Sequence, residues 1–528
     1  MFKILIADSL PKEIIEKYNQ NPELEVENKS GISAEDLITA IPNYDGLVVR
    51  SRTKATAEII NAGKNLKVIG RAGAGVDNID SVAATSRGII VMNTPGGNTI
   101  AAAEHSVAMM LSAVRNIPSA NSDMKQEKWE KKKYTGNELY EKTIGIIGLG
   151  KIGREVAKRL GAFDTTLLVY DPILTSDMAD RLGVKLVELD ELLKQSDIIT
   201  IHAPKMPETI NLLNKKKLNL CKKGVIIVNC ARGGIINEAD LLEALNSGQV
   251  SKAALDVYSS EPPTDFSLAK HPNVVATPHL GASTEEAQTK VADQILAQMV
   301  EYFTKNVARN AVNFESVEPE MQKIISPYFS LAQRLGSVFR GMKSGRLKEM
   351  VIRFYGDLLD LPVEPISAHL IVGALKGTET ELVNPVNAFA ICKDRGISIE
   401  IVKKDKVLTS HTNLISCDLK TDSGFYHFAG TVFAKDIFHL TECGEFTCDA
   451  NLDGHMLFIE NDDIPGVVGH LGIALASYKV NIGSLSLARL KQKNIALNIF
   501  TLDSPIGDGV VEELKKVKGV KQVYVVDL

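Results

Sequence analysis

Three side chains that could do chemistry each follow a short apolar stretch of the chain: Arg232, Glu261 and His279. An arginine guanidinium can grip a carboxylate through two parallel hydrogen bonds. A carboxylate beside an imidazole stabilises the charged ring, so a His279–Glu261 pair could accept the proton of an alcohol while hydride leaves. Each residue alone also suits a structural role, as a surface ion pair, a turn acid or a loop histidine. Their shared position after successive apolar stretches favours chemistry.

The elements that must position these side chains are strands of one parallel sheet. Apolar stretches predict strands at 198–202, 225–229, 253–257 and 274–277, with helical patterns such as 237–245 between them. This alternation is typical of a doubly wound sheet with helices on both faces. Such sheets bind ligands beyond the carboxyl ends of their strands, so we expect all three side chains at that edge.

A Gly-x-Gly-x-x-Gly motif at 148–153 lies between a predicted strand at 143–147 and an amphipathic segment. In this context the motif predicts a dinucleotide site. Gly148 allows the tight turn, Gly150 the close approach of a pyrophosphate, and Gly153 the packing of the helix on the strand. Backbone N–H groups at the helix start then face the phosphates. The alternative is a glycine turn that packs the unit without a ligand.

An acidic residue, Asp171, ends the next predicted strand, at 166–170. A carboxylate near this distance from the glycine motif hydrogen-bonds the adenosine ribose. Because it would repel a 2′-phosphate, Asp171 favours NAD over NADP.

Length and composition exclude several classes of protein. The 528 residues predict three or four domains, at roughly 150 residues each. The net charge of -5 and only short lysine runs disfavour a nucleic-acid partner. Six cysteines without a Cys-x-x-Cys pair predict reduced thiols, no metal site and a cytoplasmic location. No apolar run reaches the ~18 residues of a membrane span, so no membrane partner is expected.

The chain divides into four predicted parts. Residues 1–97 form an α/β unit with short parallel strands, and a helix at 283–305 is expected to carry the chain back to it. The doubly wound unit at 98–282 would then be inserted into the first. The part at 317–450 mixes strands and helices without a chemical motif. The last part, 455–528, has the βαββαβ order of a ferredoxin-like fold.

The motifs at 148–153, 229–234, 256–263 and 277–284 together resemble the D-isomer-specific 2-hydroxyacid dehydrogenase family. The resemblance implies an α/β fold in which a Rossmann-type doubly wound parallel sheet is inserted in a flavodoxin-like substrate domain. The substrate domain would comprise 1–97 plus 283–310, and the NAD-binding domain 98–282. Two α+β domains would follow: an intervening allosteric or substrate-binding-like domain at 317–450 and a ferredoxin-like ACT regulatory domain at 455–528.

The resemblance also implies a role for each candidate residue. His279 would be the acid/base, Glu261 its orienting partner, and Arg232 the clamp on the substrate carboxylate. The residues implied to bind NAD are Gly148, Gly150, Lys151, Ile152, Gly153, Asp171, His202, Pro204, Cys230, Ala231, Asp256 and Gly281. The residues implied to bind substrate are Arg50, Ser51, Arg71, Gly73 and Asn98, with Arg52 as a candidate beside Arg50. His105 is expected in packing or at an interface.

Similar C-terminal domains bind an amino acid across a paired interface. The resemblance implies L-serine as an effector, with Asn461, Asp463 and Asn481 at the matching positions. Serine-regulated relatives often offer His and Asn in this loop, so Asn461 and Asp463 depart from their pattern. A domain kept for assembly alone is the alternative. The only tryptophan, Trp129, lies in a stretch that crosses the dimer interface in relatives; otherwise it is an ordinary buried aromatic.

The motifs at 71–80 and 93–98 resemble the branch of the family that oxidises 3-phospho-D-glycerate with NAD. The implied product is 3-phosphohydroxypyruvate, in the first step of phosphorylated L-serine biosynthesis, and the implied assembly is a homo-oligomer, a dimer or tetramer. A dehydrogenase of another D-2-hydroxy acid, such as 2-hydroxyglutarate, is one alternative, and its substrate would need only one substrate-domain arginine. An NAD(H)-sensing, corepressor-like binding protein is the other.

Overall fold

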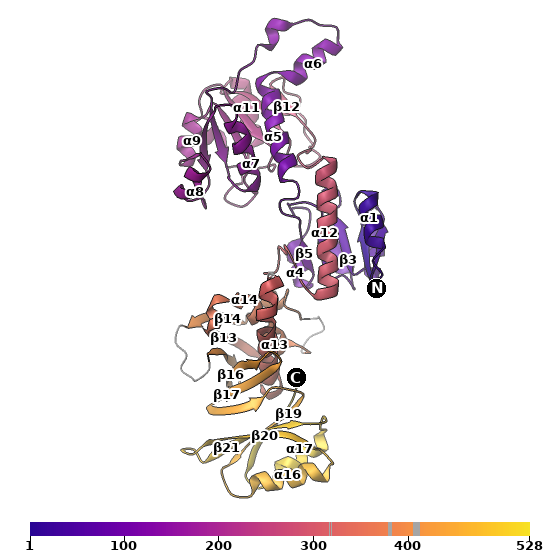
Figure 1. The fold of residues 1–528 in the computed structure, drawn as a ribbon, viewed down its shortest axis with the longest axis vertical. Helices are drawn as coiled ribbons and strands as arrows, with labels where there is room; N and C mark the ends of the chain where they lie inside the picture. The colour runs from indigo at the N-terminus through magenta and orange to yellow at the C-terminus, as the bar shows by residue number, and fades with distance from the viewer. Residues whose placement is uncertain (316, 318, 378–382, 405–411) are drawn as a thin grey trace.

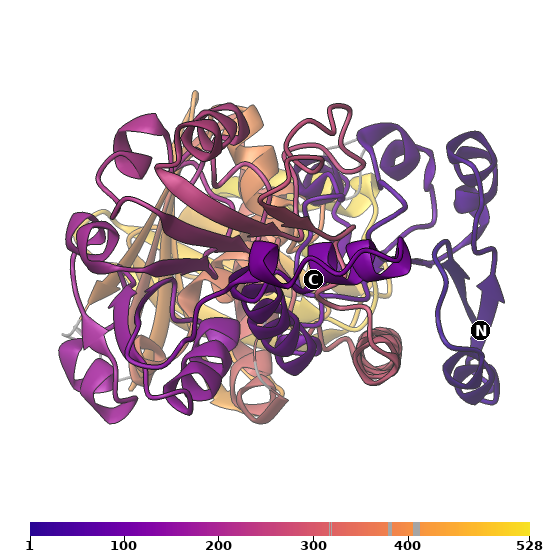
Figure 2. The same cartoon turned by 90° about the horizontal axis from the view of Figure 1, so that it is seen from above.

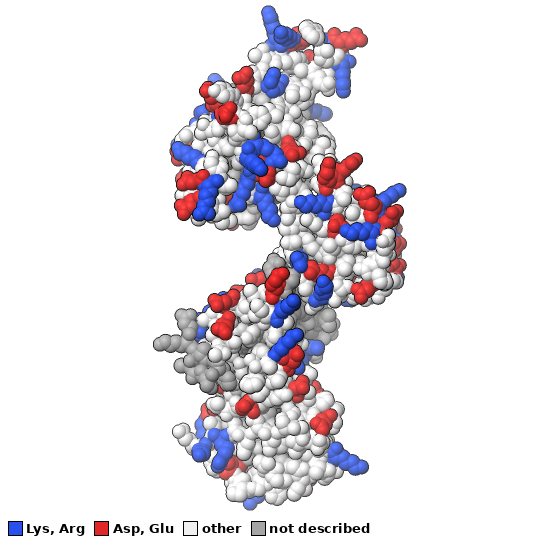
Figure 3. Space-filling view, viewed as in Figure 1, with Lys and Arg blue, Asp and Glu red and all other residues white. Residues whose placement is uncertain are grey.

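The computed structural model describes residues 1–528 apart from 316, 318, 378–382 and 405–411, and its sheets follow one another along the chain (Figure 1). Among the described residues, none of the helices combines the length and apolar character that a membrane crossing requires. On the face drawn in Figure 3, Lys and Arg are interspersed with Asp and Glu.

The first sheet is parallel throughout, with the flavodoxin-like order β2-β1-β3-β4-β5. Its strands are β1 (Phe2–Ile6), β2 (Leu24–Asn28), β3 (Gly46–Val49), β4 (Val68–Arg71) and β5 (Ile90–Met92). Its short helices are α1 (Lys12–Asn19), α2 (Ala34–Ala40), α3 (Ala57–Ala62) and α4 (Ser81–Ser86). The edge strand β2 was absent from the predicted strands, because its Leu-Glu-Val-Glu alternation is short and half charged.

A long helix, α12 (Glu285–Lys305), returns the chain to this first sheet. Thr284 caps its start, since its Oγ1 accepts the N–H of Ala287 at 3.2 Å. Ile295 and Met299 lie against Gly70 of β4, where a side chain would collide with them. The sheet and α12 therefore share one hydrophobic core.

The second sheet is also parallel, with the Rossmann order β8-β7-β6-β9-β10-β11 extended by β12. The strands are β6 (Thr143–Ile147), β7 (Thr166–Tyr170), β8 (Lys185–Leu186), β9 (Ile198–Ile201), β10 (Val225–Asn229), β11 (Val250–Leu255) and β12 (Val274–Ala276). The helices are α5 (Thr99–Val114), α7 (Lys151–Gly161), α8 (Ser176–Arg181), α9 (Leu189–Gln195), α10 (Lys215–Leu218) and α11 (Glu238–Ser247). Separate apolar clusters cover its two faces, as expected for a doubly wound sheet. Figure 2 shows the same molecule from above.

An arm leaves this domain between α5 and β6 and carries α6 (Ile117–Lys125) at one end of the molecule (Figure 1). No residue of α6 is buried. Trp129, just beyond it, is 79% exposed. The alternative of an ordinary buried aromatic is therefore wrong for this chain, whereas a contact of this stretch between copies of the chain stays a prediction.

The third sheet is mixed, in the order β14-β13-β15-β16-β17-β18, and only β13 and β14 pair in parallel. Its strands are β13 (Leu347–Gly356), β14 (Ser398–Lys404), β15 (Asn413–Thr421), β16 (Phe425–Ala434), β17 (Ile437–Cys443) and β18 (Phe446–Asn451). Its helices are α13 (Pro319–Met342), α14 (Val363–Leu375) and α15 (Ala388–Asp394). Asn384, before α15, donates through Nδ2 to the carbonyl of Gly88 at 2.8 Å, which ties this domain to the first.

The last sheet is antiparallel, in the order β20-β21-β19-β22, which is the ferredoxin-like arrangement predicted from the βαββαβ pattern. Its elements are β19 (His455–Asp462), α16 (Val467–Ser477), β20 (Ile482–Leu490), β21 (Ile495–Leu502), α17 (Asp508–Lys516) and β22 (Val520–Asp527). The two helices cover one face of this sheet. The other face shares a continuous hydrophobic core with the third sheet, through residues such as Met456, Phe458 and Val526.

Candidate active site

The three predicted catalytic side chains follow neighbouring strands of the second sheet: Arg232 after β10, Glu261 after β11 and His279 after β12. His279 Nδ1 lies 2.6 Å from Glu261 Oε2. Because an ionised carboxylate only accepts, Nδ1 carries the hydrogen and Nε2 remains as the basic atom of the ring. The structure thus brings Glu261 and His279 together as predicted from their positions.

The charge of Glu261 is secured by its neighbours. Burial alone would raise the pKa of this carboxyl, but hydrogen bonds from His279 and from the Tyr258 N–H lower it below its usual range. Glu261 is therefore ionised at neutral pH, and it can stabilise a positive charge that develops on the imidazole.

Asp256 holds the loop that carries His279. Its carboxylate is fully buried and accepts the N–H of Leu280 at 2.7 Å, the N–H of Gly281 at 2.9 Å and the hydroxyl of Thr277 at 2.6 Å. Burial would raise the pKa of Asp256, but these bonds and His105 lower it. His279 itself has a left-handed backbone, with φ of 56°. The loop geometry that aims the imidazole is thus fixed by one carboxylate.

Arg71, at the end of β4, faces the second domain without a partner. Among the described residues no hydrogen bond or ion pair engages its guanidinium, and its Nε is buried and unsatisfied. Burial first, and then the positive charge of Arg232, lower the pKa of Arg71 to about 10. Arg232 itself donates through Nε to Asp77 Oδ2 at 3.1 Å. The two domains therefore meet at a cluster of arginines.

Arg50 belongs to the same cluster, because its charge also lowers the pKa of Arg71. The buried Asp8 anchors its backbone by accepting the Arg50 N–H at 2.6 Å. Arg52 lies apart from the cluster: it is exposed, pairs with Asp8 at 3.4 Å and donates to the carbonyl of Ile32. The geometry favours Arg50 over Arg52.

The other predicted substrate residues lie at the same edge of the first sheet. Ser51 follows Arg50 and is exposed. Gly73 has φ of 153°, and a side chain there would collide with the Arg71 guanidinium. Asn98 directly precedes α5, where the chain enters the second domain. A glycine at 73 thus leaves room for the arginine.

The glycine motif forms an open cradle of the kind that a pyrophosphate requires. Gly148 has φ of 90°, a conformation that favours glycine. A methyl group on Gly150, the N-cap of α7, would meet no atom within 4 Å, whereas one on Gly153 would collide with the carbonyl of Gly148. The N–H groups of Lys151 and Ile152 lie in the first turn of α7 and are free of i−4 partners within the helix. This geometry fits NAD.

Asp171, at the end of β7, is fixed against the same cradle. Its Oδ2 accepts the N–H of Leu149 at 2.8 Å, and its Oδ1 accepts those of Ile173 and Leu174. The remaining lone pairs can accept from ribose hydroxyls. Lys151 extends from α7 toward the carbonyl of Pro95, at 3.4 Å, and so spans the two domains.

Four further predicted cofactor residues follow β9 and β10: His202, Pro204, Cys230 and Ala231. Burial lowers the pKa of His202 to about 4, so its ring is neutral at pH 7, and Nε2 lies 2.9 Å from Thr200 Oγ1. Burial raises the pKa of Cys230 to about 12, which makes it an inert thiol. Pro204 is exposed and Ala231 half-buried. None of these groups is suited to proton transfer near pH 7.

Comparison with known proteins identifies this arrangement. Residues 107–281 match the family model for the D-isomer specific 2-hydroxyacid dehydrogenase NAD binding domain, and residues 324–443 match the D-3-phosphoglycerate dehydrogenase intervening domain. The D-3-phosphoglycerate dehydrogenase of Archaeoglobus fulgidus is 41% identical over 100% of both chains. That of Synechocystis sp. is 40% identical over 100% of this chain and 95% of its own.

The chain belongs to the D-3-phosphoglycerate dehydrogenase family.

A solved structure supports the fold of its first two domains. The NAD-dependent formate dehydrogenase from Staphylococcus aureus in complex with NAD matches with a TM-score of 0.52 and 33% identity, over 57% of this chain and 96% of that one. The domain built on the second sheet is therefore the NAD-binding domain of this family.

Some residues of the site escaped the sequence analysis. Asp77 pairs with Arg232, and Asp8 anchors Arg50, yet neither was singled out. His105, expected in packing or at an interface, lies 3.1 Å from Asp256 through Nε2, a contact that the sequence analysis did not predict. These partners are far apart in the chain, so no local spacing reveals them. The one available signal was that Asp8 ends a predicted strand.

The C-terminal candidate residues do not gather within one chain. Asn461 is buried and accepts from Asn498 Nδ2 at 2.5 Å. Asp463 pairs with Arg489 at 2.7 Å, and Asn481 donates to Asp503 at 2.6 Å. The strand register places Asp463 and Asn481 at opposite ends of the last sheet. A site that uses both would need a second copy of the chain.

Proposed function

We propose that this protein oxidises 3-phospho-D-glycerate to 3-phosphohydroxypyruvate with NAD, the first step of phosphorylated L-serine biosynthesis. The observation that supports this substrate is the Arg71 guanidinium, whose buried Nε has no hydrogen-bond partner among the described residues, with Arg50 and Arg232 beside it. Three clustered cations suit a substrate with both a carboxylate and a phosphate. A substrate without phosphate, such as 2-hydroxyglutarate, would leave less negative charge to offset them.

Each side chain then has one task. Arg232 grips the carboxylate and polarises the developing carbonyl, while Arg71 and Arg50 bind the phosphate. Nε2 of His279 takes the hydroxyl proton, and Glu261 stabilises the imidazolium that results. The cradle at Gly148, Gly150 and α7 would hold NAD, with Asp171 on its ribose. Bound NAD would supply the acceptor for the hydride that leaves the carbinol carbon.

The test is steady-state NAD reduction with 3-phospho-D-glycerate against D-glycerate and D-2-hydroxyglutarate. A rate that depends on the phosphate supports the proposal. Activity confined to unphosphorylated acids would assign the chain to a sister reaction, and no activity on any of them would favour the NAD(H)-sensing binding protein.

Assembly and regulation extend this proposal. The exposed arm around Trp129 suits a contact between copies of the chain, so we expect a dimer or tetramer. The last domain would pair as ACT domains do and bind L-serine with Asn461, Asp463 and Asn481. The ion pair of Asp463 and the burial of Asn461 require both side chains to be released, which disfavours tight binding. A cytoplasmic location stays a prediction.

A further inference from the structure

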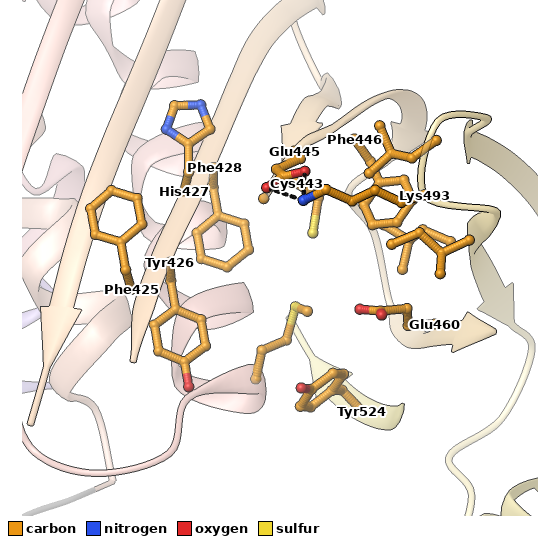
Figure 4. A pocket seen from close by; sticks show the side chains of 15 residues that line it. Phe425, Tyr426, His427, Phe428, Cys443, Glu445, Phe446, Glu460, Lys493 and Tyr524 are labelled. Carbon is orange, nitrogen blue, oxygen red and sulfur yellow. Dashed lines mark hydrogen bonds and ion pairs between the residues drawn. The ribbon is translucent and has the colours of Figure 1, made fainter. Parts of the chain in front are cut away.

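A cavity of about 280 Å³ lies between the third and fourth sheets, far along the chain from the active site (Figure 4). Strands β16, β17 and β18 form one wall, strands β19, β20, β21 and β22 the other, and the end of α13 closes it. The side chains that matter to the argument are Tyr426, Phe428, Cys443, Glu460, Lys493 and Tyr524.

Glu460 is the feature of this cavity that requires an explanation. Its carboxylate points into the space from β19, opposite Phe428 and Tyr426 (Figure 4). In the part of the chain that the structure describes, no hydrogen bond or ion pair engages its carboxylate (Figure 4). The other carboxylate of the lining, Glu445, is neutralised by Lys493 at 2.5 Å. The cavity therefore holds one uncompensated negative charge.

Aromatic rings surround that charge. Tyr426 and Phe428 project from β16, and Tyr524 from β22. Burial first raises the pKa of Tyr524, and Tyr426, Glu460 and Cys443 raise it further. The charge of Glu460 thus acts on Tyr524, its neighbour on the same wall of the cavity. A carboxylate in a cavity that aromatic side chains also line can attract a cation by ion pairing, and the rings can add cation–π attraction.

We propose that this cavity binds a small organic cation, an ammonium group on an apolar body, with Glu460 as its counter-ion. The volume lies just below the range of drug-sized pockets, which suits a molecule of amino-acid size. Free amines and α-amino acids both carry this group. Because two domains wall the cavity, an occupant stabilises the packing of the last domain on the third. The site is separate from Asp463 and Asn481 and does not depend on the substrate proposed above.

The test is calorimetric titration of the full chain with 3-methylbutylamine, with L-leucine, and with the neutral isostere 3-methyl-1-butanol. We expect one site per chain for the amine or the amino acid, and binding of the alcohol about tenfold weaker or less. Glu460→Gln keeps the shape and should weaken binding of the cation about tenfold or more. Glu512→Gln, at an exposed acid of α17 that pairs with Lys515, is the matched control and should bind as the wild type does.

A second variant tests the cavity independently, in case Glu460→Gln fails to fold. Leu490→Trp places an indole in the cavity wall and should block binding while Glu460 stays intact. Binding of the amine alone assigns the site to amines, and tighter binding of L-leucine assigns it to amino acids. The proposal is overturned if neither cation binds, if the alcohol binds equally well, or if both Glu460→Gln and Leu490→Trp leave the affinity unchanged.

Discussion

At the scale of single residues, one histidine of the site can transfer a proton near pH 7 and another cannot. His279 has a free Nε2 because Glu261 holds Nδ1, whereas His202 is neutral and buried beside the cofactor cradle. Two histidines of one domain thus have opposite roles. The difference in role comes from the neighbouring groups, because the two side chains are chemically identical.

Replacement of His279 by Ala should remove the base without disturbing the cradle at Gly150. We expect turnover to fall ~100-fold or more, with NAD affinity nearly unchanged. Stopped-flow or steady-state kinetics, together with NAD titration, measure both. Near-normal turnover in the variant would refute the role of His279.

The buried neutral ring of His202 predicts a pH-dependent loss of stability. Burial lowers the pKa of His202 in the folded chain to about 4, below the usual histidine value of about 6.5, so the unfolded chain binds the extra proton between these values. Folding stability should therefore fall on acidification from about pH 6.5 to 4, by at most about 1.4 kcal/mol per pH unit from this group. Thermal unfolding of the wild type and of His202→Gln at several pH values measures this loss of stability. If the melting temperatures of the two proteins fall equally between pH 6.5 and 4, the prediction is contradicted.

At the scale of elements, two glycines of one turn differ in purpose. Gly150 faces open space, and Gly153 faces the carbonyl of Gly148. The same methyl group should therefore have different consequences at the two positions. At Gly150 it enters the space that a pyrophosphate would occupy, and at Gly153 it must move backbone.

We expect Gly150→Ala to weaken NAD about tenfold or more while the melting temperature stays close to that of the wild type. Gly153→Ala should lower the melting temperature, because its Cβ has no room. Gly161→Ala, at the other end of α7 in open space, is the control. NAD titration and thermal unfolding separate the effects; a Gly150→Ala protein with normal NAD affinity would count against the cradle.

The elements that could be predicted from sequence are those with an unbroken pattern. The strands β6 (Thr143–Ile147), β7 (Thr166–Tyr170) and β10, which precedes Arg232, have the predicted bounds. Strand ends therefore placed the catalytic side chains correctly. The Asp256 bonds to Leu280 and Gly281, like the pairing of Arg232 with Asp77, arise from tertiary folding, so sequence spacing could not reveal them.

At the scale of the whole molecule, the arm with Trp129 offers a direct test of assembly. Trp129 is the only tryptophan and is 79% exposed in one chain. If copies pair through the arm, its emission should shift to shorter wavelength as protein concentration rises, together with a doubling of the mass in solution. Trp129→Asp should lower the association. An unchanged spectrum in a stable dimer would place the contact elsewhere.

The whole molecule brings Arg71 of the first domain to Arg232 of the second, and substrate choice depends on that meeting. The decisive measurement is the ratio of kcat/KM for 3-phospho-D-glycerate to that for D-glycerate, in the wild type, Arg71→Gln and Arg52→Gln. We predict a high ratio that falls about 100-fold in Arg71→Gln, since two or more charge-assisted hydrogen bonds are lost, and that is nearly retained in Arg52→Gln. A wild type that prefers D-glycerate, or an Arg71→Gln enzyme that loses both activities equally, would contradict the account.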